Sequence, residues 1–207
     1  MAQRSRSSSA QLALQRWPLL VVVHGHGGGA VPAVLQSLLD ELAQARGAAV
    51  WVQALTADPI EIPPRQKLLL VPLLLTPGSH VRVDVPAIRQ RLRGLGHHVR
   101  TLPFLGAWPP WLQHLRQLGC DAESQVVVHH PLRAGIADRY LHVLSQALGL
   151  PLRSADTCDA DFGRVLPLAL APNRMTAHLS AQQEGGLALL EHPATRQFLF
   201  ELLLDLP

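Results

Sequence analysis

Three histidines stand at the ends of apolar segments, where they could hold one metal ion together. His24 and His26 directly follow the apolar segment 19–23, within the stretch VVVHGHGGG. His80 comes shortly after the apolar run 71–75 and a Pro-Gly turn. Neutral imidazole binds cobalt, iron, nickel and zinc, and it also titrates near neutral pH. Histidines from two neighbouring strand ends could therefore share a divalent ion and accept protons.

The glycines around His24 leave other kinds of site open. A glycine-rich loop that opens a helix can bind phosphate, but the chain lacks G-x-x-x-x-G-K-[ST] and a complete dinucleotide fingerprint. HGGG is also typical of the oxyanion loop of lipase-like hydrolases, but the nucleophile elbow G-x-S-x-G is absent. A zinc-dependent hydrolase would need a third protein ligand, and the spacing of the chain nominates none.

We expect the remaining histidines to be structural or superficial. Most histidines beside strands serve packing or lie in loops. The pairs expected at the surface or in loops are His97-His98 and His129-His130, and those expected in helices are His114, His142 and His178.

Composition indicates a globular protein with a substantial core. The chain has 207 residues, of which 48% are hydrophobic, and its formal net charge is +3. Its longest apolar runs, such as 68–75, are far shorter than the roughly 20 residues of a membrane-spanning helix. Arginines supply the basic charge without a stripe of interleaved aromatic residues, so we predict neither a nucleic-acid partner nor a membrane.

The ends and the cysteines predict a cytoplasmic location. Residues 1–17 are rich in arginine and serine, and we expect a flexible tail rather than a targeting segment. Cys120 and Cys158 have neither disulfide nor metal spacing, which favours free thiols in a reducing compartment.

Apolar runs alternate with helical patterns along the chain. This alternation predicts an α/β fold in which helices cover both faces of parallel sheets. Ligands of such sheets bind at the carboxyl ends of the strands, where the HGHGGG stretch falls. The expected strands are 19–23, 49–54, 68–74, 98–102, 125–128 and 164–170, and the expected helices are 31–46, 85–95, 109–118, 135–148 and 191–204.

The chain also repeats itself. Residues 21–50 align with 126–152 at an offset of 105, and residues 71–80 align with 166–175 at an offset of 95. We therefore predict two similar lobes with a cleft between them, each a parallel four-stranded sheet flanked by helices: 18–118, and a degenerate repeat at 119–207. His24 aligns with His129 and His80 with Met175, so the N-terminal lobe is expected to be the active one.

Two stretches resemble the class II chelatases of tetrapyrrole biosynthesis, the family of the sirohydrochlorin cobaltochelatases and ferrochelatases. Members typically show a strand followed by H-G-S-R, and later P-L-F-L-x-x-G-x-H-V-x-x-D-I-P. This chain has VVVHGHGG at 21–28 and VPLLLTPGSHVRVDVP at 71–86, and the second match is the more specific. The resemblance covers most of the chain, because 166–182 and 191–203 are similar to the second half of two-lobed members.

The resemblance implies a lyase that inserts a divalent metal, Co²⁺ or Fe²⁺, into sirohydrochlorin for cobalamin or siroheme biosynthesis. The ion is then a substrate, and neither ATP nor an organic cofactor is required. His24 and His80 would be the catalytic residues and would bind the metal, with His26 as a further ligand. His26 would replace His24 as the family histidine if the alignment slips, although ungapped counting favours His24.

A flat polycarboxylate needs a close backbone approach on its face and arginines at its rim. The residues expected to line this substrate are Gly25, Gly27, Gly78, Ser79, Arg82 and Arg133. Two fused lobes predict a monomer.

The sequence departs from the family pattern at two places. His26-Gly27 replaces the Ser-Arg pair, and Val83 stands where an acidic residue often follows the second histidine. The loss of that acid leaves an alternative open, a catalytically weak carrier of tetrapyrrole or metal related to the chelatases.

Overall fold

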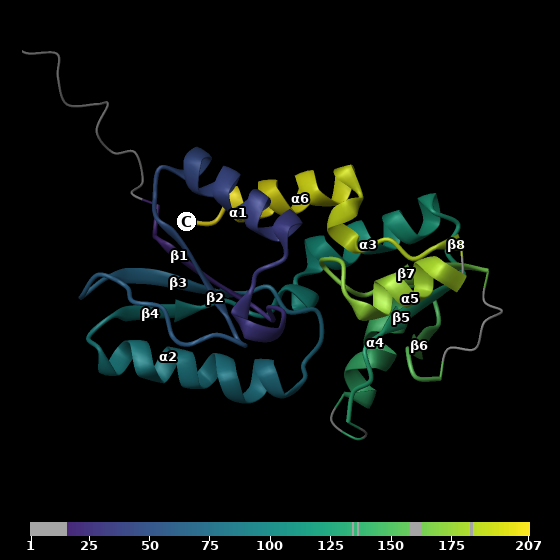
Figure 1. Cartoon of the computed structure of the whole chain (residues 1–207), viewed down its shortest axis with the longest axis horizontal. Helices are drawn as coiled ribbons and strands as arrows, with labels where there is room; N and C mark the ends of the chain where they lie inside the picture. The colour runs from purple at the N-terminus through teal and green to yellow at the C-terminus, as the bar shows by residue number, and fades with distance from the viewer. Residues whose placement is uncertain (1–15, 134, 136, 158–162, 183) are drawn as a thin grey trace, which may run out of the picture.

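A computed structural model describes residues 16–133, 135, 137–157, 163–182 and 184–207 (Figure 1). The predictions for residues 1–15 of the tail and for Cys158 lie outside these residues. Cys120 is a free, exposed cysteine.

The N-terminal lobe is built on a parallel sheet with the strand order β2-β1-β3-β4. Its strands are β1 (Leu19–Val23), β2 (Val50–Ala54), β3 (Lys67–Pro72) and β4 (His98–Thr101). Helix α1 (Ala33–Arg46) packs with Leu19 and Val21 of β1, whereas α2 (Val85–Gly94) packs with Leu20 and Val22. Every residue of β1 is buried because a helix covers each face, which explains its unbroken apolar sequence.

The second lobe repeats this plan with the parallel strand order β6-β5-β7-β8. Val127 packs towards helix α4 (Asp138–Leu148), and Val126 and Val128 pack towards helix α5 (Arg174–Gln182). The two sheets confirm the predicted fold class. The strands and helices that follow β4 in the chain are α3 (Pro109–Asp121), β5 (Val126–His129), α4 (Asp138–Leu148), β6 (Leu152–Ser154), β7 (Arg164–Pro167), α5 (Arg174–Gln182), β8 (Glu184–Gly185) and α6 (Pro193–Leu204).

The sequence missed the short elements. Strands β6 and β8 have three and two residues and lie at the sheet edges, so they show no apolar run. Helix α5 is absent from the expected helices, although His178 within it was expected to be helical; it follows a proline-containing loop and buries only one face of a mostly polar segment. The remaining short helical turns are η1 (Gly27–Gly29), η2 (His80–Asp84), η3 (Leu105–Ala107) and η4 (Leu189–Glu191).

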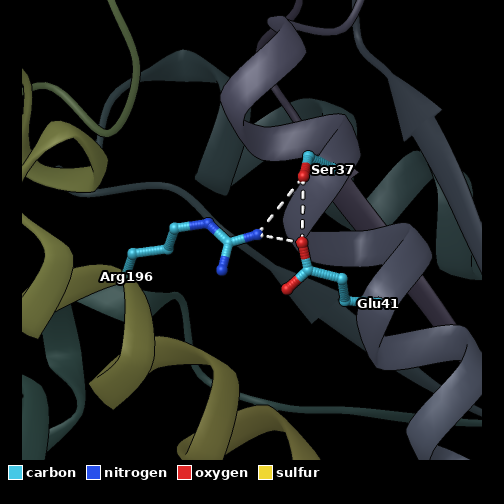
Figure 2. A network of polar contacts seen from close by, with 3 residues as sticks. All are labelled: Ser37, Glu41 and Arg196. Atoms are coloured by element: carbon cyan, nitrogen blue, oxygen red, sulfur yellow. Dashed lines mark hydrogen bonds and ion pairs between the residues drawn. The ribbon is translucent and has the colours of Figure 1, made fainter.

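The C-terminal helix returns to the first lobe. Figure 1 shows α6 beside α1, and Figure 2 shows Arg196 of α6 reaching Glu41 and Ser37 of α1. The Arg196 guanidinium donates to Glu41 at 2.5 Å and to Ser37 at 3.3 Å, and it lowers the pKa of Glu41. Buried Arg46 at the end of α1 donates to five backbone oxygens, four of which lie at 203–207. These bonds tie residues 203–207 to the end of helix α1.

A tyrosine joins the lobes at the end of β3. The hydroxyl oxygen of Tyr140 on α4 lies 2.8 Å from the carbonyl oxygens of both Leu75 and Gly106, and burial raises its pKa. A side chain at Gly106 would collide with Leu75 and with that hydroxyl. The predicted boundary between 118 and 119 falls inside α3, which packs on α4 and α6, and the lobe limits remain a prediction.

Candidate functional site

The first candidate loop leaves β1 through a sharp turn that requires glycine. Gly25 has φ of +77°, and a Cβ there would lie 2.6 Å from Oγ1 of Thr56. The Thr56 hydroxyl instead donates to the carbonyl of His26 at 2.7 Å. This contact fixes the loop against the segment that follows β2, and it leaves His24 at the carboxyl end of the sheet.

The second candidate histidine begins a wide helical turn. His80 is the first residue of η2, which has π-helical geometry and runs directly into α2. Nδ1 of His80 lies 2.6 Å from Oδ2 of Asp84 at the end of this turn. A carboxylate only accepts, so Nδ1 carries the hydrogen and Nε2 is left with its lone pair or, in the cation, a second hydrogen. Carboxylates that orient ligating imidazoles in this way are common at metal sites.

The rings of His24 and His80 meet. Their centroids are 4.8 Å apart, and the planes are nearly perpendicular at 83°. Nδ1 of His24 donates to the carbonyl of Gly25 at 2.8 Å, so its Nε2 is also the nitrogen available to a ligand. Two imidazole nitrogens on one tetrahedral ion stand about 3.3 Å apart, given bonds of about 2.0 Å, so ligands of one ion belong to rings that lie as close together as these.

The other predicted site residues differ in their exposure and in their contacts. His26, Ser79, Arg82 and Arg133 are exposed, and among the described contacts none brings the ring of His26 to His24 or His80. Gly78 faces the second lobe, because a Cβ built on it would lie 3.8 Å from Leu132. A Cβ on Gly27 would meet nothing within 4 Å. The binding roles of these residues stay predictions.

Asp84 is an acidic partner of His80 that the sequence analysis did not identify, because it considered only position 83. Val83 is 62% exposed, whereas Asp84 accepts from the ring of His80. The signal in the sequence was the H-V-x-x-D spacing of the resemblance, in which the acid stands four residues after the histidine. Residues four apart lie on the same face of a helical turn, so the carboxylate reaches the imidazole.

His129 ends the central strand of the second lobe, and His130 follows it. Partial burial lowers the pKa of His130, and electrostatic interactions with His24 and His129 lower it further. His129, in contrast, is buried as the last residue of β5, and its Nδ1 donates to the carbonyl of His130. The prediction that His129-His130 is a surface or loop pair was therefore wrong for His129. His97 does lie in a loop, before β4, but it is buried and accepts from the backbone of Gln66.

The paired rings are open to solvent rather than enclosed. Two cavities of about 320 and 260 Å³ lie in the second lobe, and neither is lined by His24 or His80. Within the described ranges, no group of three His, Cys, Asp or Glu side chains could hold a metal ion. The helices of the same ranges are all too short or too polar to cross a bilayer.

Two solved structures share this architecture. The sirohydrochlorin chelatase SirB from Bacillus subtilis subspecies spizizenii, solved in complex with cobalt, matches with a TM-score of 0.55 at 13% identity, over 90% of this chain and 93% of SirB. CbiX, the terminal enzyme for biosynthesis of siroheme in denitrifying bacteria, matches with a TM-score of 0.54 at 21% identity, over 90% of this chain and 97% of CbiX. This chain has the sirohydrochlorin chelatase fold.

The chelatase fold confirms the resemblance that the segments 21–28 and 71–86 indicated. Searches by sequence find no matching protein family and no matching curated protein. The chelatase likeness is therefore a likeness of architecture.

Proposed function

We propose that this protein is a metal chelatase that inserts Co²⁺ or Fe²⁺ into sirohydrochlorin. The observation that carries the proposal is the contact between His24 and His80, each with Nε2 free of protein partners in the recorded bonds and with Asp84 behind His80. The fold adds support, because both SirB and CbiX belong to tetrapyrrole chemistry by their names.

Two imidazoles suit a metal ion that is a substrate. Resident structural zinc usually takes four protein ligands and catalytic zinc three, whereas the described residues offer this pair without a third ligand. An ion held by two imidazoles keeps open positions that pyrrole nitrogens can fill, and it can be released with the product. The open setting of the rings lets a flat macrocycle approach them.

The reaction also has to remove two protons from the macrocycle and water from the ion. Histidine accepts protons near neutral pH. Arg82 is exposed on η2, just after the loop that contains Gly78, and Arg133 is exposed on the loop that contains Leu132, where the two loops approach each other. We propose that they bind carboxylates at the rim of the substrate, as guanidinium groups do in bidentate pairs. We propose that the protein acts as a monomer, because one chain contains both lobes. We also propose that it acts in the cytoplasm.

The decisive experiment follows the absorption spectrum of sirohydrochlorin mixed with the purified protein and Co²⁺ or Fe²⁺. Conversion faster than in the protein-free control supports the chelatase. Tight binding of the pigment with an unchanged rate of insertion would instead identify a carrier, the other function that the sequence left open.

The His80→Ala variant tests the assigned site. We expect it to lose insertion while it keeps the far-ultraviolet circular dichroism spectrum and melting temperature of the wild type, because His80 begins a surface turn and is not a core residue. His178→Ala is the matched control, since His178 is exposed on α5 of the other lobe. Full turnover of His80→Ala would refute the role of this residue.

A further inference from the structure

The strand registers show which residues of the two lobes correspond to each other. In the first lobe Val22 pairs with Pro72, and in the second Val128 pairs with Pro167. The structural offset from β1 to β5 is therefore 106 residues (128 minus 22) instead of the 105 that the sequence alignment predicted.

This offset puts an imidazole in a core position of the second lobe. His130 corresponds to His24, and His129 corresponds to Val23, of which 2% is exposed. His129 is enclosed almost as fully, with 5% of its surface exposed. A buried polar group costs free energy unless it is hydrogen-bonded. The partners of the His129 ring therefore show whether the protein alone satisfies it.

Only one nitrogen of this ring has a partner among the described residues. Nδ1 of His129 donates to the carbonyl oxygen of His130 at 2.7 Å. In the neutral ring Nε2 is then an acceptor, and none of the recorded bonds reaches it. His129 lines a cavity of about 260 Å³ beside the carboxyl end of β5. A ligand in that cavity would supply the donor that Nε2 lacks.

The other walls of the cavity come from helix α4 and the edge strand β6. Leu141, Pro151 and Leu152 form its apolar part, and exposed His142 and Arg153 line it as well. The guanidinium of Arg153 turns back to the carbonyl of Leu152 over a long bond of 3.3 Å, so it remains available to a stronger acceptor. Among the described residues that line the cavity, none is Asp or Glu. These charges favour an anion over a metal ion or an ammonium group.

We infer that this cavity binds a small 2-hydroxycarboxylate with an apolar side chain. The hydroxyl group donates to Nε2 of His129, the carboxylate accepts from the guanidinium of Arg153, and the apolar side chain lies against the leucines and the proline. Neither His24 nor His80 lines the cavity. The site is therefore separate from the proposed insertion site and does not depend on the proposed function.

Calorimetric titration of the full chain with L-2-hydroxy-4-methylpentanoate tests this site. We expect a Kd of about 1 mM, which is in the range for a ligand of this size. The analogue 4-methylpentanoate lacks the hydroxyl group, and 4-methylpentane-1,2-diol lacks the carboxylate. Each should bind about tenfold more weakly, since each loses one hydrogen-bonded group. Free leucine should also bind more weakly, because its ammonium group would lie near a guanidinium without a carboxylate of the protein beside it.

Three variants and a matched control assign the contacts. His129→Asn keeps an amide that can donate to the carbonyl of His130 but has no acceptor at the position of Nε2, so Kd should rise about tenfold. His129→Gln offers an amide oxygen near that position and should recover part of the affinity. Arg153→Met keeps the apolar stem of an exposed side chain, so it should leave the melting temperature unchanged and also raise Kd about tenfold. The control Arg174→Met, on α5 and outside the cavity lining, should bind as the wild type does.

Four results would overturn the inference. The wild type could fail to bind the hydroxy acid at about 20 mM, or it could bind 4-methylpentanoate or leucine equally well. Arg153→Met could keep the wild-type affinity, which would locate the ligand elsewhere. Sirohydrochlorin could displace the hydroxy acid, which would make this cavity part of the insertion site. Binding is measured without a metal ion, so its failure is distinct from a failure of metal insertion.

Discussion

The carboxylate of Asp84 should control how tightly His80 binds a metal ion. Replacement by asparagine removes the negative charge but keeps an oxygen that can accept from Nδ1 of His80. Replacement by alanine removes both the charge and the hydrogen bond that orients the ring. The two variants therefore separate the electrostatic contribution from the positioning contribution.

The size of the effect follows from the distance and the exposure of the pair. Unit charges about 4 Å apart interact by about 1 kcal/mol in water and about 4 kcal/mol at the dielectric constant typical of a protein surface. The side chains of His80 and Asp84 are 39% and 42% exposed, so the solvent end of that range applies. We expect Asp84→Asn to weaken Co²⁺ binding about tenfold, or about 1.4 kcal/mol, and Asp84→Ala about 30-fold, within the range for partners of ligating histidines.

Titration of the purified protein with Co²⁺, followed by calorimetry or by the visible absorption of the bound ion, measures these affinities. Asp40→Asn is the matched control, because Asp40 is an exposed carboxylate on α1 that bonds only to Gln36 in the recorded contacts. Unchanged Co²⁺ affinity in Asp84→Ala would refute the reasoning. Val83→Asp should change the affinity less than threefold, since Val83 points into solvent and Asp84 already contacts His80.

Three further predictions concern the scaffold. Gly25→Ala should lower the free energy of unfolding by about 1–2 kcal/mol, because Gly25 has a positive φ and a Cβ there would collide with Thr56. Urea denaturation measures this loss, and the control Gly27→Ala should leave the stability unchanged. Arg46→Met should cost about 3 kcal/mol of stability, since it removes charged hydrogen bonds to five backbone oxygens. A loss below about 1 kcal/mol would contradict that role. Burial lowers the pKa of His114 in the folded protein. Below about pH 6.5 the unfolded chain therefore binds more protons than the folded chain. The free energy of unfolding should therefore be lower at pH 5.5 than at pH 7.5. His114→Gln should reduce this difference, and an equal difference in the variant and the wild type would refute the role of His114.

The fold could be predicted because its central strands are buried on both faces. Such strands must be almost wholly apolar, and the run 19–23 coincides with β1 for that reason. Edge strands β6 and β8 bury less and are short, so the same signal is absent from them. The return of α6 to α1 could not be predicted from periodicity, because an amphipathic pattern shows that a helix has a partner and does not say which one.

The sequence by itself determined the two strand ends that carry His24 and His80, since parallel strands direct their carboxyl ends to one edge of a sheet. Only the tertiary structure decided that these two rings are in contact, that Asp84 supports His80 through a wide helical turn, and that His130 corresponds to His24. A shift of one residue between two apolar strands leaves the sequence pattern almost unchanged, yet it moves every side chain to the opposite face of the sheet. Hydrogen-bonded register, which is a property of the folded chain, therefore assigns the histidine of the second lobe.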